Sequence, residues 1–234
     1  MAYKQESIKK MIETMGDTMR KYARVPLDRI PLCISSGNRK IGRVMNVSLP
    51  PVLSCGNCGK CKYFCYDIKA CLQYPGTVID ARIRNWTILK RDREEYFRRI
   101  EEKISRRRRN KYFRWHVSGD LIDRDYLENV VQIAKRHPDF TFWTYTKMYG
   151  LVNEYVADGG RIPGNLSIMF SEWDGVPVVN PYGFPVFSCR MKAGNKNHGP
   201  EYFRGLYKCP GNCDVCKSLH RGCIAGENTF ADEH

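Results

Sequence analysis

Cysteine is the residue type with the most chemistry in this sequence: eleven are present, and eight of them fall in two short runs. The first run is Cys55-x2-Cys58-x2-Cys61-x3-Cys65, which places four thiols within 11 residues. Four thiolates this close can surround one compact metal group, and the spacing equals that of the bacterial ferredoxin run for a [4Fe–4S] cluster. The run therefore predicts a metal site, with an iron–sulfur cluster favoured. Cys71, six residues on, is a reserve ligand.

A second run stands near the end of the sequence. Its cysteines are Cys209, Cys213, Cys216 and Cys223. The set suits an auxiliary iron–sulfur cluster, and it also suits zinc, because tetrahedral zinc accepts four thiolates. Both alternatives are open, with iron–sulfur favoured. The isolated Cys33 and Cys189 are expected to pack as unliganded thiols.

The composition limits the class of protein. With 234 residues, 42% hydrophobic and 27% charged, the chain is typical of a globular protein and not of a disordered or fibrous one. No apolar run approaches the roughly 18 residues of a membrane helix, and the first residues do not resemble a secretion signal. We expect a cytoplasmic protein without a membrane partner. A reducing cytosol and an odd cysteine count argue against a disulfide framework.

Strand and helix patterns alternate along the chain, which predicts an α/β fold with a parallel sheet. Four or five strands are too few for an eight-stranded barrel, so we expect an incomplete βα barrel or an open sheet, with its site at the carboxyl ends of the strands. The expected helices cover 4–24, 78–104, 124–136 and 150–158, and the expected strands 43–49, 113–120, 140–147, 166–170 and 185–189. The expected regions are an N-terminal lead-in (1–42), a βα core (43–193) and a cysteine-rich metal-binding cap (194–234).

The strand predicted over 113–120 alternates between two kinds of side chain. Its apolar face carries Phe113, Trp115 and Val117. Its polar face carries Arg114, His116 and Ser118. If helices cover the apolar face, the polar face lines a cavity, and these three residues are candidate catalytic groups. The alternative for His116 is a hydrogen-bonded core histidine. Lys147, at the end of the next strand, is either solvated or an anion contact.

Basic charge is concentrated in one segment. The chain has 39 Lys and Arg against 25 Asp and Glu, a net of +14, and residues 81–111 alone contribute 13 basic and 5 acidic residues. The Arg-rich segment 82–109 ends in four consecutive arginines, a pattern that suits phosphate contacts with a nucleic acid or nucleotide. The alternative is a solvated helix face with internal pairs, such as Glu95 with Arg98 and Arg99.

The order of these motifs resembles that of radical S-adenosylmethionine (SAM) enzymes. The resemblance implies that Cys58, Cys61 and Cys65 hold a [4Fe–4S] cluster with one open iron. It also implies that the turn at Ser118-Gly119-Asp120 contacts the SAM amine through Gly119 and Asp120. The aromatic neighbours of the cluster would be Phe64 and Tyr66. The usual Cys-x3-Cys-x2-Cys spacing is reversed in the first run and occurs in the second, where it suits an auxiliary cluster better.

The chain resembles more closely a phage-encoded family called gene product eighty-eight. The residues that carry this likeness are Ser48-Leu-Pro-Pro51, Cys65-Tyr66, Phe113–Asp120, Thr146-Lys147, Asn180-Pro-Tyr-Gly183 and Cys209-Pro-Gly-Asn-Cys213. The likeness spans residues 43–234. It supports a radical-SAM-like fold and cofactor more strongly than it supports any particular reaction. Three functions follow as hypotheses: a radical-SAM-like enzyme, a non-catalytic cysteine–metal protein that binds nucleic acid, and an electron carrier.

Overall fold

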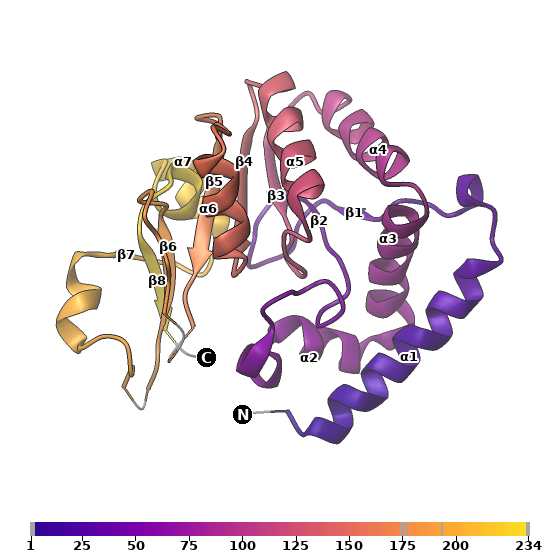
Figure 1. Ribbon diagram of the computed structural model, residues 1–234, viewed down its shortest axis with the longest axis horizontal. Helices are drawn as coiled ribbons and strands as arrows, with labels where there is room; N and C mark the ends of the chain where they lie inside the picture. The colour runs from indigo at the N-terminus through magenta and orange to yellow at the C-terminus, as the bar shows by residue number, and fades with distance from the viewer. Residues whose placement is uncertain (1–2, 174, 176, 193, 233–234) are drawn as a thin grey trace. The chain divides into compact units, whose positions relative to one another are not determined.

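The computed structural model (Figure 1) describes residues 3–173, 175, 177–192 and 194–232. Residues 1–2, 193 and 233–234, at the ends of the three predicted regions, lie outside the described residues. The chain forms two compact units, and it passes between them several times. We call the first the helical unit; it comprises residues 1–35, 47–108 and 116–120. The second, the sheet unit, comprises residues 36–46, 109–115 and 121–234.

Eight strands form one sheet in the order β1-β2-β3-β4-β5-β6-β8-β7. Their bounds are β1 Ile34–Ser35, β2 Met45–Val47, β3 Tyr112–Trp115, β4 Thr141–Thr146, β5 Leu166–Ser171, β6 Val186–Arg190, β7 Tyr207–Lys208 and β8 Thr229–Asp232. Each neighbouring pair from β3 to β7 in that order is parallel. The predicted α/β class is therefore confirmed, with a mostly parallel sheet that does not close; barrel character is not confirmed.

The helical unit packs its helices through apolar faces that the sequence indicates. Its helices are α1 Gln5–Ala23, α2 Tyr66–Gln73, α3 Asp80–Arg91 and α4 Arg93–Ser105. On α1, Ile8, Met11 and Met15 are buried at helical spacing. Ile83 of α3 and Ile100 of α4 are buried as well. None of the described helices is long and apolar enough to cross a membrane.

The single helix predicted over 78–104 is wrong, because Asp92 divides it. Asp92 has extended backbone angles (φ −154°, ψ 99°), and its side chain accepts the N–H of Glu95 at 2.9 Å. An aspartate that caps a new helix ends the previous one, and the apolar spacing runs on across the break. A π-helical turn, Pro75–Ile79, leads into α3.

In the sheet unit, helices α5 (Arg124–Arg136) and α6 (Tyr149–Ala157) cover one face of the sheet. Tyr126 of α5 packs edge-on against Trp115, with ring centroids 6.4 Å apart, and Tyr149 of α6 packs on Phe170 at 5.0 Å. These contacts show that helices cover the aromatic face, which was the condition for a cavity on the polar face.

The opposite face of the sheet is covered by the C-terminal segment. Helix α7 (Cys213–Leu219) and the short helix Gly222–Ala225 contribute Cys216, Cys223 and Ile224 to an apolar cluster with Trp143 and Met169. Around Trp143 and Met169, this face is therefore packed by the C-terminal segment and does not line an open cavity.

Candidate metal centres

The four cysteines of the first run lie on one loop of the helical unit, which we call the cysteine loop (residues 54–65). A six-residue 3-10 helix, Gly59–Phe64, forms its second half, and Cys65 is the N-cap of α2. All four cysteines are reduced and half-buried. The Cys55 and Cys58 thiols hydrogen-bond to each other. Of the predicted aromatic neighbours, Phe64 and Tyr66 are exposed.

Two thiols of the loop, those of Cys55 and Cys65, have raised pKa values. The hydrogen bond to Cys58 and then burial raise the pKa of Cys55, and the nearby Asp120 carboxylate adds to the rise. Burial raises the pKa of Cys65 to about 12, although the backbone N–H groups of Ile68 and Asp67 partly oppose it. Metal binding to these two thiols must therefore release protons.

A buried amide fixes the approach to the cysteine loop. Asn85 of α3 is 0% exposed, and its side-chain oxygen accepts the Cys33 N–H at 2.8 Å. Its amide nitrogen donates to the carbonyls of Cys33 at 2.9 Å and of Ser48 at 3.0 Å. Asn85 thus joins α3 to the two segments that lead into β1 and into the cysteine loop.

A buried ion pair fixes the other end of the loop. Asp67, in the first turn of α2, accepts two hydrogen bonds from the Arg82 guanidinium, at 2.9 and 3.3 Å. The Cys71 thiol lies 3.9 Å from the same carboxylate. Burial, followed by the Asp67 charge, raises the pKa of Cys71 to about 12. The reserve ligand therefore has a protein partner of its own.

The turn over residues 116–120 packs against the entrance to the loop. The Leu49 N–H donates to the Ser118 carbonyl at 2.9 Å, and the Tyr66 hydroxyl donates to the Val117 carbonyl. Gly119 has φ +97°, and a Cβ there would lie 2.8 Å from Ser54 Oγ. Only glycine fits such a position without a shift of the loop. The predicted SAM-contacting turn and the cysteine loop therefore lie side by side.

The period-two pattern of the strand predicted over 113–120 does not extend past Trp115, where β3 ends. His116 has φ 57°, a left-handed conformation that interrupts the alternation of faces. His116, Ser118 and Asp120 are buried in the helical unit. Arg114 belongs to the sheet unit, so the strand pattern does not place it with His116 and Ser118 on one face. The catalytic roles of Arg114, His116 and Ser118 stay predictions.

The second set of cysteines belongs to the sheet unit and has a different environment. Cys209 follows β7, Cys213 begins α7, and Cys216 and Cys223 are only 7% and 8% exposed. The Tyr207 hydroxyl lies 3.8 Å from Cys216 Sγ, and the Tyr145 hydroxyl hydrogen-bonds to Cys223. These hydroxyls and the apolar cluster around them enclose the two buried thiols.

The C-terminal cysteines influence one another's pKa values. Burial raises the pKa of Cys213 to about 11 and that of Cys223 to about 12, and proximity to Cys209 adds to both. Arg114 lowers both values, because its guanidinium charge faces these thiols. That guanidinium lies 4.6 Å from the centre of the Tyr145 ring. Arg114 is therefore a neighbour of the C-terminal cysteines.

Neither set converges on one point: among the described residues, no three His, Cys, Asp or Glu side chains are grouped so that they could hold a single metal ion. In a [4Fe–4S] cluster each thiolate binds a different iron, so the four sulfurs stand farther apart than around one ion. The chemistry and the loop placement of the first set fit such a cluster. Zinc in the second set would require its four thiols to move together.

The comparisons with known proteins give one match. The model of a family described as Gene product 88 matches residues 28–175, more than half of the chain. The chain belongs to the gene product 88 family. Comparisons with curated proteins and with solved structures gave no match. The predicted resemblance to this phage gene-product family is therefore confirmed.

The span matched to gene product 88 divides the predicted motifs. It includes the cysteine loop and the turn over residues 116–120, and it ends before the C-terminal cysteines. The likeness expected over residues 43–234 is thus borne out by the family model only as far as residue 175. The family description does not state an activity.

In the structure, much of the Arg-rich segment 82–109 is engaged in internal contacts. At least six of its arginines contact carboxylates or main-chain carbonyls: Arg82, Arg84, Arg91, Arg98, Arg99 and Arg106. Glu95, for example, lies 2.6 Å from both Arg98 and Arg99. The exposed Arg108 and Arg109 lie beyond the end of α4. These contacts favour the interpretation of most of this charge as a self-paired helix surface.

Sequence reasoning missed the polar residues that anchor the cysteine loop. Asn85 and Arg82 lie within a helical pattern whose charged residues indicate an exposed helix. Asp67 resembles an ordinary acidic residue in the first turn of a helix. The one signal available was position: Asp67 stands two residues after Cys65, where an acid can orient the helix that follows a ligand.

Proposed function

We propose that this gene product 88 protein is an iron–sulfur protein in which Cys55, Cys58, Cys61 and Cys65 form the binding set for a [4Fe–4S] cluster. The observation that carries the proposal is the gathering of four half-buried thiols on one anchored loop. Asn85 and the Asp67–Arg82 pair hold the two ends of this loop, so the thiols need only local adjustment to reach a cluster.

The finer proposal is that three of these thiols bind the cluster and that its fourth iron takes SAM. Such a cluster supplies an electron for reductive cleavage of SAM. The chain would contribute the turn over residues 116–120: Gly119 allows close approach of the backbone, and Asp120 offers a carboxylate to the SAM amine. Support comes from the packing of this turn against the loop entrance, with Asp120 in electrostatic reach of Cys55. On this proposal, the sheet is the incomplete parallel barrel of a radical-SAM-like fold.

Cys55 separates the two versions of the proposal. As the fourth ligand it would block SAM; as a neighbour of Cys58 it would leave one iron open. We would purify wild-type, Cys55→Ser and Cys58→Ser proteins without oxygen, add dithionite and SAM, and measure 5′-deoxyadenosine by mass spectrometry. SAM cleavage predicts product from wild-type and Cys55→Ser proteins and none from Cys58→Ser.

Two other results have definite meanings. Product from Cys55→Ser alone would show that Cys55 closes the cluster in the native protein. No product from any variant with a fully reduced cluster would contradict SAM chemistry and favour the electron carrier. Loss of iron and sulfide from every preparation would contradict the iron–sulfur proposal itself.

We propose that the C-terminal cysteines hold a second metal group with a structural role, either an auxiliary [4Fe–4S] cluster or zinc. Its support is the apolar enclosure of Cys216 and Cys223, which suits a closed site without an open coordination position. The ratio of iron to zinc in purified protein distinguishes the two groups.

Nucleic-acid binding is a second candidate function, and it rests on the exposed Arg108 and Arg109. It predicts affinity for single-stranded or duplex DNA that falls as the salt concentration rises from about 50 to about 200 mM. The reason is that each phosphate contact releases counterions, and on the order of two or three contacts are expected here. An R108A/R109A variant with unchanged affinity in a fluorescence anisotropy titration would contradict it.

A further inference from the structure

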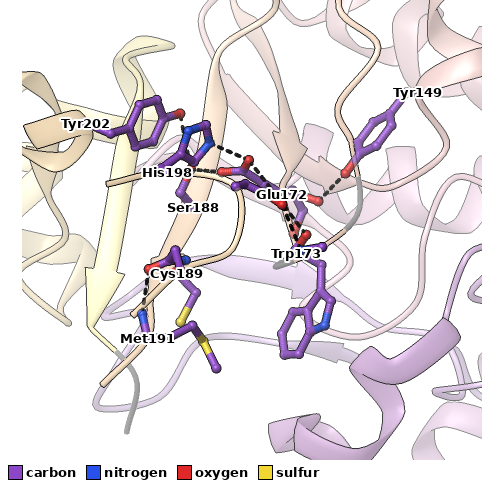
Figure 2. A network of polar contacts seen from close by, with 12 residues as sticks. Tyr149, Glu172, Trp173, Ser188, Cys189, Met191, His198 and Tyr202 are labelled. Carbon is purple, nitrogen blue, oxygen red and sulfur yellow. Dashed lines mark hydrogen bonds and ion pairs between the residues drawn. The ribbon is translucent and has the colours of Figure 1, made fainter. Parts of the chain in front are cut away.

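A polar network lies in the sheet unit, beyond the end of β5 (Figure 2). Its centre is Glu172, which directly follows β5 and is 9% exposed. One carboxylate oxygen lies 2.6 Å from His198 Nε2, and the other accepts the Ser188 hydroxyl of β6 at 2.6 Å. The Asn197 amide also donates to Glu172, at 3.3 Å. Three donors thus fix the position of this carboxylate.

The carboxylate also fixes the state of the imidazole. Glu172 as a carboxylate can only accept hydrogen bonds, so the proton of a neutral His198 must be on Nε2. Nδ1 then carries the lone pair, and it has no hydrogen-bond partner among the residues that the structure describes. A carboxylate that holds one imidazole nitrogen and leaves the other available is the arrangement that orients a general base.

The ring of His198 is held in place and is still accessible. It stacks flat on the Tyr202 ring, with centroids 3.5 Å apart and planes within 6° (Figure 2). Its side chain is 25% exposed.

The position of Glu172 in the fold also supports a ligand-binding site. Glu172 follows the carboxyl end of β5, and Ser188 lies on the neighbouring parallel strand β6. Ligands of open parallel sheets bind beyond the carboxyl ends of the strands. A site at this edge of the sheet is predicted from the alternating strand and helix pattern, whereas Glu172 and His198 belong to no recognisable sequence motif.

We infer that Glu172 and His198 form an acid–base site separate from both cysteine sets. Its ligand is a molecule with a nucleophilic O–H or N–H group: an alcohol, an amine or a water molecule. Nδ1 takes the proton of this group, the ligand keeps the bonding electron pair as the nucleophile, and the imidazolium that forms is balanced by the Glu172 carboxylate. The site needs neither metal nor redox chemistry.

The probe for this site is diethyl pyrocarbonate, which acylates unprotonated imidazole nitrogens. Nδ1 forms a bond to a carbonyl carbon, ethyl carbonate leaves, and the Nε2 proton passes to Glu172 or water. We would treat the full-length protein at pH 7.5 and follow each histidine by peptide mass spectrometry. The exposed His220 is the internal reference for solvent access, and the buried His116 is the protected one.

We expect His198 to react faster than His220 even though it is less exposed. Glu172→Gln should slow the reaction at His198 by about tenfold, because it removes the charge-assisted hydrogen bond that orients the ring. Glu201→Gln is the matched control: it makes the same carboxylate-to-amide change at an exposed residue three positions from His198, so the rate at His198 should stay near that of wild type. Equal rates in wild-type and Glu172→Gln proteins would overturn the inference.

A measurement on the wild-type protein avoids any folding defect of the variants. Nitrogen-15 NMR of the imidazole distinguishes the two neutral tautomers. We expect the Nε2–H form at His198. A predominant Nδ1–H form, or a reaction at His198 slower than at His220, would also overturn the inference.

Discussion

The two cysteine sets of this protein are held in opposite ways. In the helical unit, polar anchors outside the cysteine loop position it, and its four thiols stay half-buried. In the sheet unit, Cys216 and Cys223 are part of an apolar cluster with Trp143, Met169 and Ile224. The first set can be approached by a ligand, whereas the second is built into a core.

We propose that this difference separates a functional metal site from a structural one. Thiols inside a core contribute to folding whether or not they bind metal, so replacing them should lower the stability of the whole sheet unit. Thiols on an anchored loop can change partners while the helices beneath them stay folded. Stability and metal content should therefore respond differently to changes in the two sets.

The largest effect is expected from Cys216→Ser with Cys223→Ser. Two hydroxyls would replace thiols in an apolar cluster, and a metal would lose two ligands, so the free energy of unfolding should fall by about 5 kcal/mol. Urea unfolding followed by tryptophan fluorescence measures this. The matched variant, Cys55→Ser with Cys58→Ser, should lose less than about 1 kcal/mol, since its side chains are half-exposed. Equal losses would remove the distinction between the two sets.

The next effect concerns the polar anchor of the cysteine loop. Asp67→Asn leaves the Arg82 guanidinium buried without its countercharge, which should destabilise the helical unit by about 3–5 kcal/mol. Hydrogen exchange over α2 should increase in parallel. Asp139→Asn is the control, because its pair with Lys111 is exposed and screened by solvent, so its loss should change the stability little. An Asp67→Asn protein as stable as the control would show that the anchor is dispensable.

A smaller effect is expected at the turn beside the loop. Gly119→Ala forces a Cβ to within 2.9 Å of the Leu49 Cβ at φ +97°, so we expect a loss of about 2–3 kcal/mol. Gly59→Ala, with φ +43° and open space around it, should lose only about 1 kcal/mol. Thermal unfolding of the two variants gives the comparison. If Gly59→Ala is the more harmful, the close packing of turn and loop is wrong.

The smallest effect is a pH dependence in the helical unit, away from either cysteine set. Hydrogen bonds from Arg98 and then Arg99 lower the pKa of Glu95 to about 2. A lowered carboxyl pKa adds stability above the usual value of 4.5, and this stability is lost as the pH falls toward 2. Glu95→Gln should therefore lower stability at pH 7 by at most about 1 kcal/mol, after screening by solvent, and by less at pH 3. A difference that grows on acidification would contradict this sign.

Much of the fold was predictable because its elements have strong local signals. The helix predicted over 124–136 coincides with α5, and the strand predicted over 140–147 contains β4. Short elements were missed, since β1, β7 and β8 have two to four residues and gain their order from neighbouring strands. The break at Asp92 was missed because the apolar spacing continues across it.

For the candidate sites, the sequence predicts which cysteines group together but not what surrounds them. Cysteine spacing groups the thiols into two sets, and the resemblance to radical SAM enzymes predicts the turn at Gly119 near the first set. Long-range polar contacts were beyond reach: Asn85 meets Ser48, and Glu172 meets His198, only through the folded chain. The alternating pattern predicts one shared face for Arg114, His116 and Ser118. This prediction fails because β3 ends at Trp115, and the left-handed backbone of His116 interrupts the alternation.

Iron, zinc and acid-labile sulfide in protein purified without oxygen test the central claim most directly. Wild-type protein should contain at least about four iron and four sulfide per chain. Cys58→Ser should lose about that amount and stay folded, whereas Cys216→Ser should lose a separate metal group together with stability. Zinc without sulfide in the wild-type protein, or Cys58→Ser with an unchanged iron content, would contradict the claim that the cysteine loop holds an iron–sulfur cluster.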